Sequence, residues 1–353
     1  MTKTIITLVL LLLLPVDICQ AQAATTGPAP TELVFAYFPM AVPVAPLGEV
    51  MRRDLILQQN LAKQGFKINF LTLAKGKDAV ELIRQQKLDG VSFSDLPTVE
   101  TITTGDMQVL GFVKQSFSAV VAPSATQVKD LRKKRIGTVP GSTSHYALLH
   151  ALQAAGIKEQ EVTLVAMEAI DLIDALATGK VDAVAGWEPT PTAILSKYPG
   201  RFSLIHRQIS YSYFLLSPEL LHRQPAVARE ISAALLRAIR WLKKSETNLI
   251  MASNWTLASM AKLTGKTPQL TAGEIAQLTI NDLLSVPGAP LLRATEGDAN
   301  SPLARLFHFM KNQGQLPATA DWNRARDNIN HTLLKEISGQ PTKYRLQTFS
   351  YVP

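Results

Sequence analysis

The chain has 353 residues, 46% hydrophobic composition and a formal net charge of +8, so it is long enough for two domains with sizeable cores. Its lysines and arginines are scattered, and the basic run at residues 132–135 abuts a predicted strand without interleaved aromatic residues. This distribution indicates a solvated basic surface and argues against nucleic-acid binding.

The first 23 residues have the features of a secretory signal peptide: Lys3, an apolar run over residues 5–16, and Ala21-Gln22-Ala23 as a cleavage site. The apolar run is too short for a membrane span of about 20 residues. Cys19, the single cysteine, lies in this segment and lacks the small preceding residue of a lipoprotein signal, so we expect no lipid anchor. The exported mature protein would have no disulfide or Cys-based zinc site, and we expect no metal and no cofactor.

Residues 24–31 are rich in Pro, Ala and Thr and are predicted to be a disordered leader. From residue 33 the pattern alternates between strands and helices. Strands are predicted at 33–38, 67–73, 90–93 and 107–113, and helices at 47–63, at 77–86 and after residue 97. This alternation predicts an α/β fold whose mainly parallel sheet carries helices on both faces.

A second alternating series begins at residue 136. Its predicted strands are 136–139, 162–166, 181–185 and 202–206, and its predicted helices are 143–155, 170–178 and one after residue 191. Residues 78–91 align without gaps on residues 171–184, and a proline follows each segment within a few residues. The chain therefore predicts two lobes with two equivalent strand ends.

Two apolar strands, predicted at 117–121 and 213–216, are the natural crossings between the lobes and would form a hinge. The predicted domain organisation is a first part of lobe 1 at 32–122, an inserted lobe 2 at 123–212, and a return at 213–353. The return contains a strand, helices packed on lobe 1 and a tail. Its helices are predicted at 226–242, 249–263, 274–284, 302–311 and 321–337.

Gly141-Ser142-Thr143 joins a short β-branched strand to an apolar helix, with Ser142 or Thr143 as the natural N-cap. A helix start has free N–H donors and a partial positive charge, so this turn could hold a small anion. An ordinary capped turn is the alternative. The turn lacks the Gly-Lys-Ser/Thr of a P-loop, and Ser142 is not in a Gly-x-Ser-x-Gly elbow.

Ligands of open α/β sheets bind outside the carboxyl ends of the strands, where Ser94-Asp95 and Trp187-Glu188 are expected to face one crevice. Trp187 is either a flat wall for a ligand or a core residue. Asp95 and Glu188 either contact the ligand or cap helices, and Asp95 could select an amine. His145 either hydrogen-bonds an anion or lies on the surface.

Residues 134–149 with 155–157, and residues 179–189, resemble the type 2 periplasmic solute-binding proteins of ABC importers, in the taurine, aliphatic sulfonate, nitrate and thiamine-precursor branch. The resemblance implies that Ser142 and Thr143 bind an oxyanion. It also implies that the loop containing Phe38, Met40 and Val42 covers the ligand. One relative of this fold is an enzyme that makes the thiamine pyrimidine with a cysteine-rich segment, which the mature chain would lack.

The resemblance predicts a monomeric periplasmic protein, not an enzyme, that captures a small organic anion such as a sulfonate or carboxylate with a short apolar body. Its partner would be an ABC permease and ATPase complex. The protein would contact the membrane only peripherally, through this complex. One alternative is a ligand-sensing partner of a membrane signalling protein. The other is an exported serine hydrolase with Ser142 as nucleophile and His145 as base, which the three-residue spacing disfavours.

Overall fold

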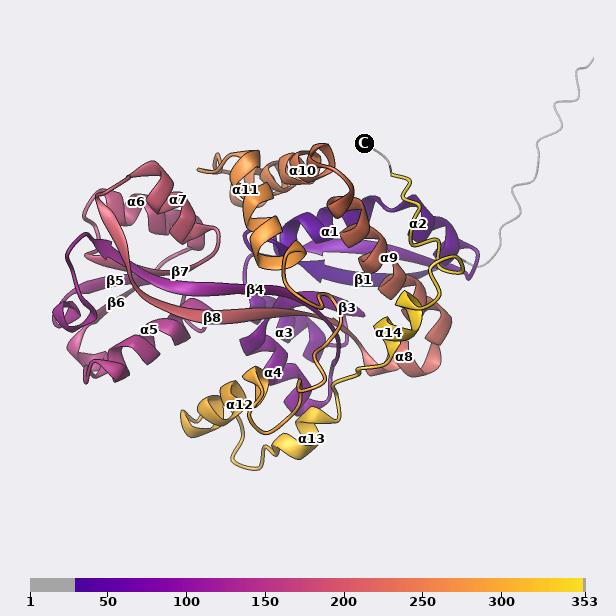
Figure 1. Ribbon diagram of the computed structural model, residues 1–353. Coiled ribbons are helices and arrows are strands. Elements are labelled where there is room, and N and C mark those ends of the chain that lie inside the picture. Colours follow the sequence, from indigo (N-terminus) through magenta and orange to yellow (C-terminus); the bar gives the residue numbers. More distant parts are fainter. Residues whose placement is uncertain (1–28, 352–353) are drawn as a thin grey trace, which may run out of the picture.

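The computed structural model describes residues 29–351 (Figure 1). The predicted signal peptide, and residues 24–28 of the predicted leader, lie outside the described residues. Within the described range, none of the helices is both long and apolar enough to cross a bilayer.

One eight-stranded sheet passes through both halves of the molecule in the order β2-β1-β3-β8-β4-β7-β5-β6. In the first half, which we call lobe 1, β1 pairs in parallel with β2 and β3; in the second, lobe 2, β5 pairs in parallel with β6 and β7. The short strands are β1 (Thr31–Tyr37), β2 (Phe66–Thr72), β3 (Gly90–Ser94), β5 (Arg135–Thr138), β6 (Thr163–Ala166) and β7 (Ala183–Trp187).

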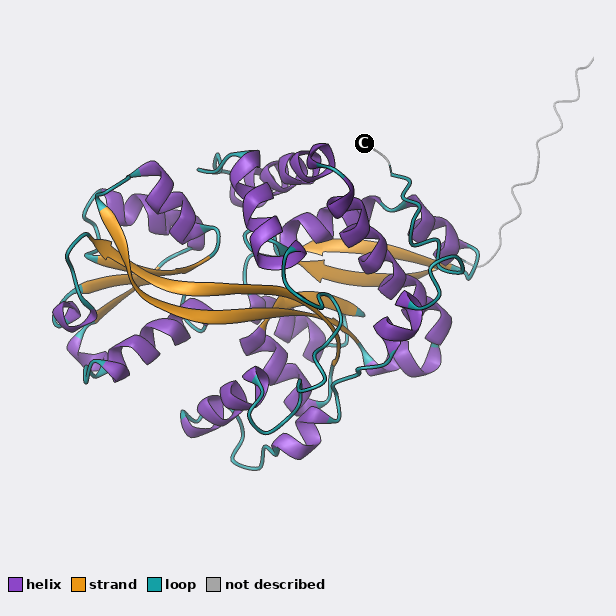
Figure 2. Cartoon of the chain, viewed as in Figure 1, coloured by secondary structure: helices purple, strands orange, loops and turns teal. Residues whose placement is uncertain are grey.

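The two crossing strands are longer than predicted. β4 (Gln108–Pro123) unites the predicted strands at 107–113 and 117–121, and β8 (Phe202–Leu216) unites those at 202–206 and 213–216. At about 3.3 Å per residue each spans about 50 Å, which reaches through both lobes (Figures 1 and 2). Residues 114–116 and 207–212, which lie outside the predicted strands, belong to these two continuous strands. Both strands pass from lobe to lobe without a break, so the structure marks no boundary along them. The lobe boundaries at 122/123 and 212/213 therefore stay predictions.

The two aligned segments occupy equivalent places. Residues 78–91 belong to α3 (Gly76–Arg84) and β3, and residues 171–184 belong to α6 (Leu172–Ala177) and β7. Each of these strands lies between a parallel neighbour and one of the long antiparallel strands. The predicted pair of equivalent strand ends is therefore present, one in each lobe.

The helix predicted at 47–63 is two helices, α1 (Val44–Arg53) and α2 (Leu55–Ala62). Asp54 separates them because its extended backbone leaves the helical region and its carboxylate accepts hydrogen bonds from the N–H groups of Ile56 and Leu57. A residue that caps the second helix in this way ends the first.

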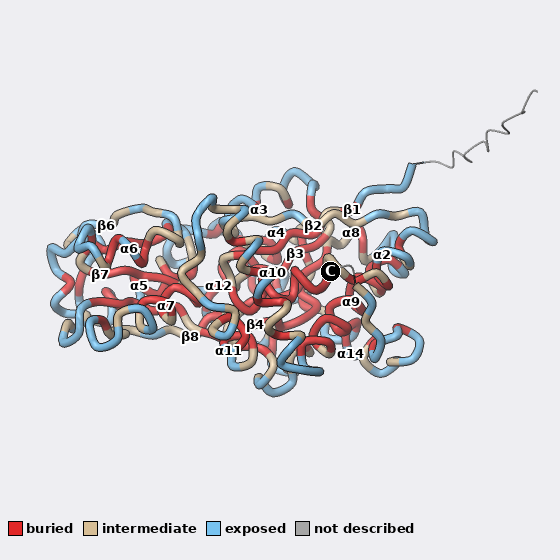
Figure 3. The backbone as a smooth tube through the Cα atoms, turned by 90° about the horizontal axis from the view of Figure 1, so that it is seen from above, coloured by how far each residue is buried: buried red, intermediate tan, exposed pale blue. Residues whose placement is uncertain are grey.

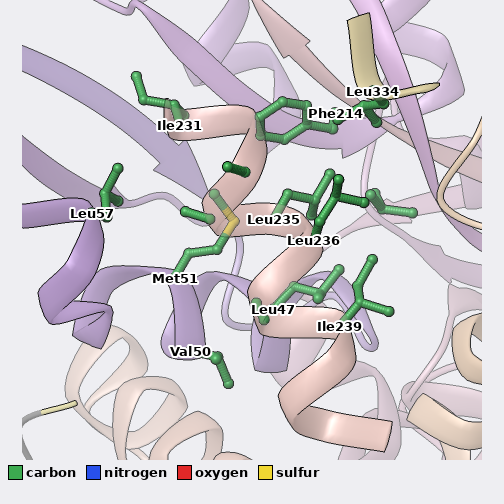
Figure 4. Close-up of a cluster of buried hydrophobic side chains, with 14 of the residues drawn as sticks. Leu47, Val50, Met51, Leu57, Phe214, Ile231, Leu235, Leu236, Ile239 and Leu334 are labelled. Atoms are coloured by element: carbon green, nitrogen blue, oxygen red, sulfur yellow. The ribbon is translucent and has the colours of Figure 1, made fainter. Parts of the chain in front are cut away.

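The C-terminal helices pack on lobe 1, as predicted. The long helix α9 (Pro225–Lys244) places Ile231, Leu235 and Ile239 against α1 in the main core cluster (Figure 4). The backbone coloured by burial shows a buried interior in both lobes, with exposed residues at the edges (Figure 3). The remaining α-helices are α4 (Asp95–Thr104), α5 (Thr143–Ala154), α7 (Thr190–Lys197), α8 (Pro218–Arg223), α10 (Glu246–Thr264), α11 (Ala272–Thr279), α12 (Pro302–Asn312), α13 (Trp322–Arg326) and α14 (Leu333–Ser338).

Two features of the C-terminal region differ from the prediction. The stretch 321–337 forms two separate helices, α13 and α14, and a π-helix (Ile280–Leu284) follows α11. The segment after α10 also reaches across to lobe 2, where Gln269 contacts Lys197 and Asp174. The C-terminal region therefore touches both lobes.

Candidate functional site

A cavity of about 660 Å³ lies between the lobes, next to the middle of β4 and β8. Most of its wall comes from lobe 1, and lobe 2 contributes the β5–α5 turn and the end of β7. Seven of the residues predicted for the site line this cavity: Phe38, Met40, Ser94, Gly141, Ser142, Thr143 and Trp187.

The β5–α5 turn has the predicted geometry but fewer free donors than expected. Gly141 has a positive φ of 71°, and Ser142 is the N-cap, whose Oγ accepts from His145 N at 3.2 Å. The N–H of Gly141 donates to His145 Nδ1 at 3.2 Å. The N–H groups of Thr143 and Ser144 have no hydrogen-bond partner among residues 29–351. Of these two residues only Thr143 lines the cavity, so the anion-binding capacity of this turn rests mainly on the Thr143 N–H.

His145 does not line the cavity. Its Nδ1 supports the turn, and burial lowers its pKa, so the ring favours the neutral form that accepts from Gly141. Ser142 Oγ donates to the carbonyl oxygen of Val139 at 2.6 Å rather than to a histidine nitrogen. Ser142 and His145 thus lack the side-chain pairing that a nucleophile and its base require.

Lys114 is the main site residue that the sequence did not reveal. It lies in the middle of β4, lines the cavity and is 4% exposed. Its ammonium forms no ion pair or hydrogen bond with any residue between 29 and 351. Burial lowers its pKa, while the charges of Asp282, Glu188 and Asp95 raise it. An anion in the cavity would give this ammonium the direct partner that it lacks among the described residues.

Hydroxyl groups surround Lys114 on the same face of the sheet. Ser212 on β8 pairs across the strands with both Ser94 on β3 and Lys114 on β4, and directly opposed residues point to the same side. Ser92 and Ser210 lie two positions away on the same strands and also line the cavity. We call Lys114, Ser92, Ser94, Ser210 and Ser212 the floor. It offers one cation and four hydroxyl donors.

Asp95 lies just behind the cavity and joins the two lobes. Its Oδ2 accepts from Tyr211 N at 3.0 Å, and its Oδ1 accepts from Leu96 N at 3.0 Å and from the Thr143 hydroxyl at 3.3 Å. Burial raises the pKa of Asp95 to about 6, against the lowering effect of these hydrogen bonds. Asp95 is the first residue of α4, and its carboxylate holds the backbone N–H groups of Leu96 and Tyr211. It does not line the cavity itself but contacts Thr143, which does.

Glu188 is fully buried and is not part of the cavity wall. It follows β7 and accepts hydrogen bonds from the N–H and hydroxyl of Thr192 in the first turn of α7. Burial raises the pKa of Glu188 to about 7, and burial likewise raises that of Asp282. Glu188 thus accepts hydrogen bonds in the first turn of α7, and its negative charge also interacts with the ammonium of Lys114. Whether Asp95, Glu188 or His145 contacts a ligand stays a prediction.

Three aromatic residues form part of the cavity wall. Phe38 stacks on Phe93 with ring centroids 6.5 Å apart, and both rings border the cavity. The indole N–H of Trp187 donates to the carbonyl oxygen of Met40 at 3.0 Å, which connects lobe 2 to the first loop of lobe 1. Trp187 and Met40 also separate the cavity from a second one of about 260 Å³. Trp187 is therefore both a wall and a contact between lobes.

No group of three or more His, Cys, Asp or Glu side chains within residues 29–351 is placed to hold a metal ion. The described cavity offers an ammonium, hydroxyls, backbone N–H groups and aromatic walls. Groups of these kinds are suited to binding and orienting an anion.

Two α/β lobes, joined by two long strands and enclosing a cavity, define the type 2 periplasmic-binding-protein fold, as predicted. The chain belongs to the family described as NMT1/THI5 like, which matches residues 61–245. The taurine-binding periplasmic protein of Escherichia coli K12 is 24% identical over 220 residues, covering 58% of this chain and 64% of the relative. The chain thus spans less than two thirds of the length of this relative.

Solved structures share the fold. The alkanesulfonate-binding protein SsuA from Xanthomonas axonopodis pv. citri, bound to MOPS, has a TM-score of 0.63 at 20% identity, over 86% of this chain and 99% of that one. The desulfurization enzyme DSZB has a TM-score of 0.58 at 15% identity, over 88% and 99%. The fold thus occurs in both binding proteins and an enzyme.

Proposed function

We propose that this protein is an exported solute-binding protein that captures an organic anion, such as a sulfonate, between its lobes and delivers it to an ABC permease and ATPase complex. The observation that carries the proposal is the buried ammonium of Lys114, which lines the cavity without a direct ion pair or hydrogen bond among the described residues. The family and the taurine- and alkanesulfonate-binding relatives support it.

The floor and the β5–α5 turn suit a tetrahedral or planar oxyanion. Lys114 supplies the charge, the serine hydroxyls supply hydrogen bonds, and the N–H group of Thr143 lies at a helix start on the cavity wall. Micromolar affinity requires about 8 kcal/mol, which several such contacts can provide together. The pairing of Ser142 with Val139 favours binding over catalysis, so we infer that the protein does not turn over its ligand.

Titration calorimetry with taurine, alkanesulfonates, nitrate and short carboxylates tests the proposal, with alkylamines and neutral sugars as controls. We expect one or more anions to bind and the amines and sugars not to bind. Hydrolysis of a sulfonate or acyl ester that Ser142→Ala abolishes, or binding restricted to a cation, would contradict the proposal.

Anion affinity is expected to rise as the pH falls from 8 to 5.5. The pKa of Glu188 is about 7 and that of Asp95 about 6, so both carboxylates are neutralised in this window. Protonation removes negative charge near the bound anion, and a bound anion in turn favours the protonated forms. If the carboxyl pKa is one unit higher in the anion-bound protein than in the free protein, anion affinity should rise about tenfold across this pH window. Calorimetry at several pH values measures this, and Glu188→Gln should flatten the profile. A wild-type affinity that falls towards low pH would refute the expectation.

Asp95→Asn is expected to leave the ratio of taurine affinity to ethanesulfonate affinity unchanged within about twofold, the usual scatter for independent sites. The physical reason is that both Asp95 oxygens already accept hydrogen bonds from the protein and do not line the cavity. The ratio is measured by calorimetry on both proteins. A marked loss of preference for taurine would show instead that Asp95 recognises the ligand amine.

A further inference from the structure

The cavity extends well beyond the floor. An apolar arm continues from the Phe38–Phe93 pair between helices α3, α4 and α12, where Val80, Leu96 and Met310 line it. These three side chains are almost completely buried, although they border open space. The floor therefore occupies one end of a longer compartment.

The size of the compartment exceeds what a very small anion needs. A volume of about 660 Å³ corresponds to roughly 22 water molecules at about 30 Å³ each, and it lies within the range of pockets that bury drug-sized ligands. A nitrate or taurine on the floor would leave the arm filled with water against apolar walls. Apolar surface removed from water stabilises a complex in proportion to its area.

Charges of both signs surround the outer end of the arm. Lys77, Asp78 and Glu81 lie on α3, and Arg84 pairs with Glu100 of α4. Arg84 and Glu100 neutralise one another, and Lys77 and Asp78 are exposed, so this end offers no second buried charge of the kind that Lys114 provides on the floor. The arm is thus suited to an uncharged chain or ring that ends near solvent.

We propose that the solute is an amphipathic anion, whose head group binds Lys114 and the serines of the floor and whose extended apolar body lies in the arm along Val80, Leu96 and Met310. This inference rests on the proposed function and deepens it. It requires a longer apolar body than the short one that the sequence suggested. Sulfonates and carboxylates share the required chemistry, and a matched series of each distinguishes them.

Calorimetry with alkane-1-sulfonates from ethane to octane, and with alkanoates of the same chain lengths, tests the inference. We expect affinity in the series with the correct head group to rise about fourfold per methylene until the arm is full. Affinity that does not change with chain length, while ethanesulfonate binds, would overturn the inference and leave the proposed function standing. If no member of either series binds, the inference fails; the proposed function fails with it only if taurine and nitrate also do not bind.

Val80→Phe should shorten the arm and weaken octanesulfonate binding at least tenfold while ethanesulfonate binding is retained. Retained ethanesulfonate binding also shows that the variant is folded. Leu82→Phe, on the same helix but outside the cavity wall, is the matched control and should leave both affinities unchanged. Met310→Ala provides an independent test, because removing part of the wall should reduce the gain per methylene. If octanesulfonate affinity is insensitive to both Val80→Phe and Met310→Ala, the alkyl chain of the ligand lies elsewhere. That result would overturn the inference.

Discussion

Lys114→Met is expected to weaken binding of the anionic solute by about 2–5 kcal/mol, roughly thirtyfold or more, the range for removing one partner of a buried charge pair. Lys114 is the buried cation of the floor, and methionine keeps most of its length while removing the charge. The variant should fold normally, because the ammonium forms no hydrogen bond or ion pair with the described residues and is costly to bury. Calorimetry with the solute that binds the wild-type protein measures the loss.

Lys77→Met is the matched control. Lys77 borders the same cavity but is exposed at its outer end, so solvent and salt screen its charge. We expect its loss to change affinity by at most about 1 kcal/mol. If Lys114→Met retained wild-type affinity, or lost no more than Lys77→Met, the floor would not be the anion site. The proposed function would then lose its main support.

Arg237→Met is expected to lower the free energy of unfolding by about 3–5 kcal/mol, because it removes one member of a buried ionic group. Arg237 donates hydrogen bonds to Asp54 and Glu230, each at 2.7 Å, and to the carbonyl oxygen of Tyr344 at 2.9 Å. It thereby joins α9 to the α1–α2 junction and to the C-terminal tail. Burial already raises the pKa of Asp54, and loss of the guanidinium leaves that carboxyl without its cation. Urea denaturation measures the change.

Arg229→Met, on the same helix, is the control for this experiment. Its side chain is exposed and lies 3.9 Å from Glu336, and surface pairs of this kind contribute about 0–1 kcal/mol. Ligand affinity of the folded Arg237→Met protein should match the wild type, since Arg237 does not line the cavity. Equal stabilities of the two variants would mean that the buried ionic group contributes little net stabilisation.

Local signals predicted the β5–α5 turn correctly. A β-branched strand, a Pro-Gly turn and a serine N-cap are all encoded within a few neighbouring residues, so the geometry of Gly141 and Ser142 follows from nearby sequence. The pairing of His145 Nδ1 with the Gly141 N–H is equally local. It was missed because the spacing alone does not specify which way the imidazole points.

Lys114 could not be recognised in the same way. Lys114 lies with Gln115 and Ser116 in the short polar stretch between the predicted strands at 107–113 and 117–121, and no local signal distinguishes it there. Its burial arises only when β8 pairs along its whole length with β4 and brings Ser212 beside it. The polar run is therefore not a break in the strand, and it places Lys114 on the floor of the cavity.

The sequence by itself determined the alternation of strands and helices, the two equivalent halves and the position of the β5–α5 turn, because each depends on periodicity and capping over short distances. The tertiary structure decided which charges meet. Lys114, Asp95, Glu188 and Asp282 come from separate elements, and their mutual effects depend on burial and on distances through space. The apolar arm was decided in the same way, because its walls come from three helices that only the packed lobe brings together.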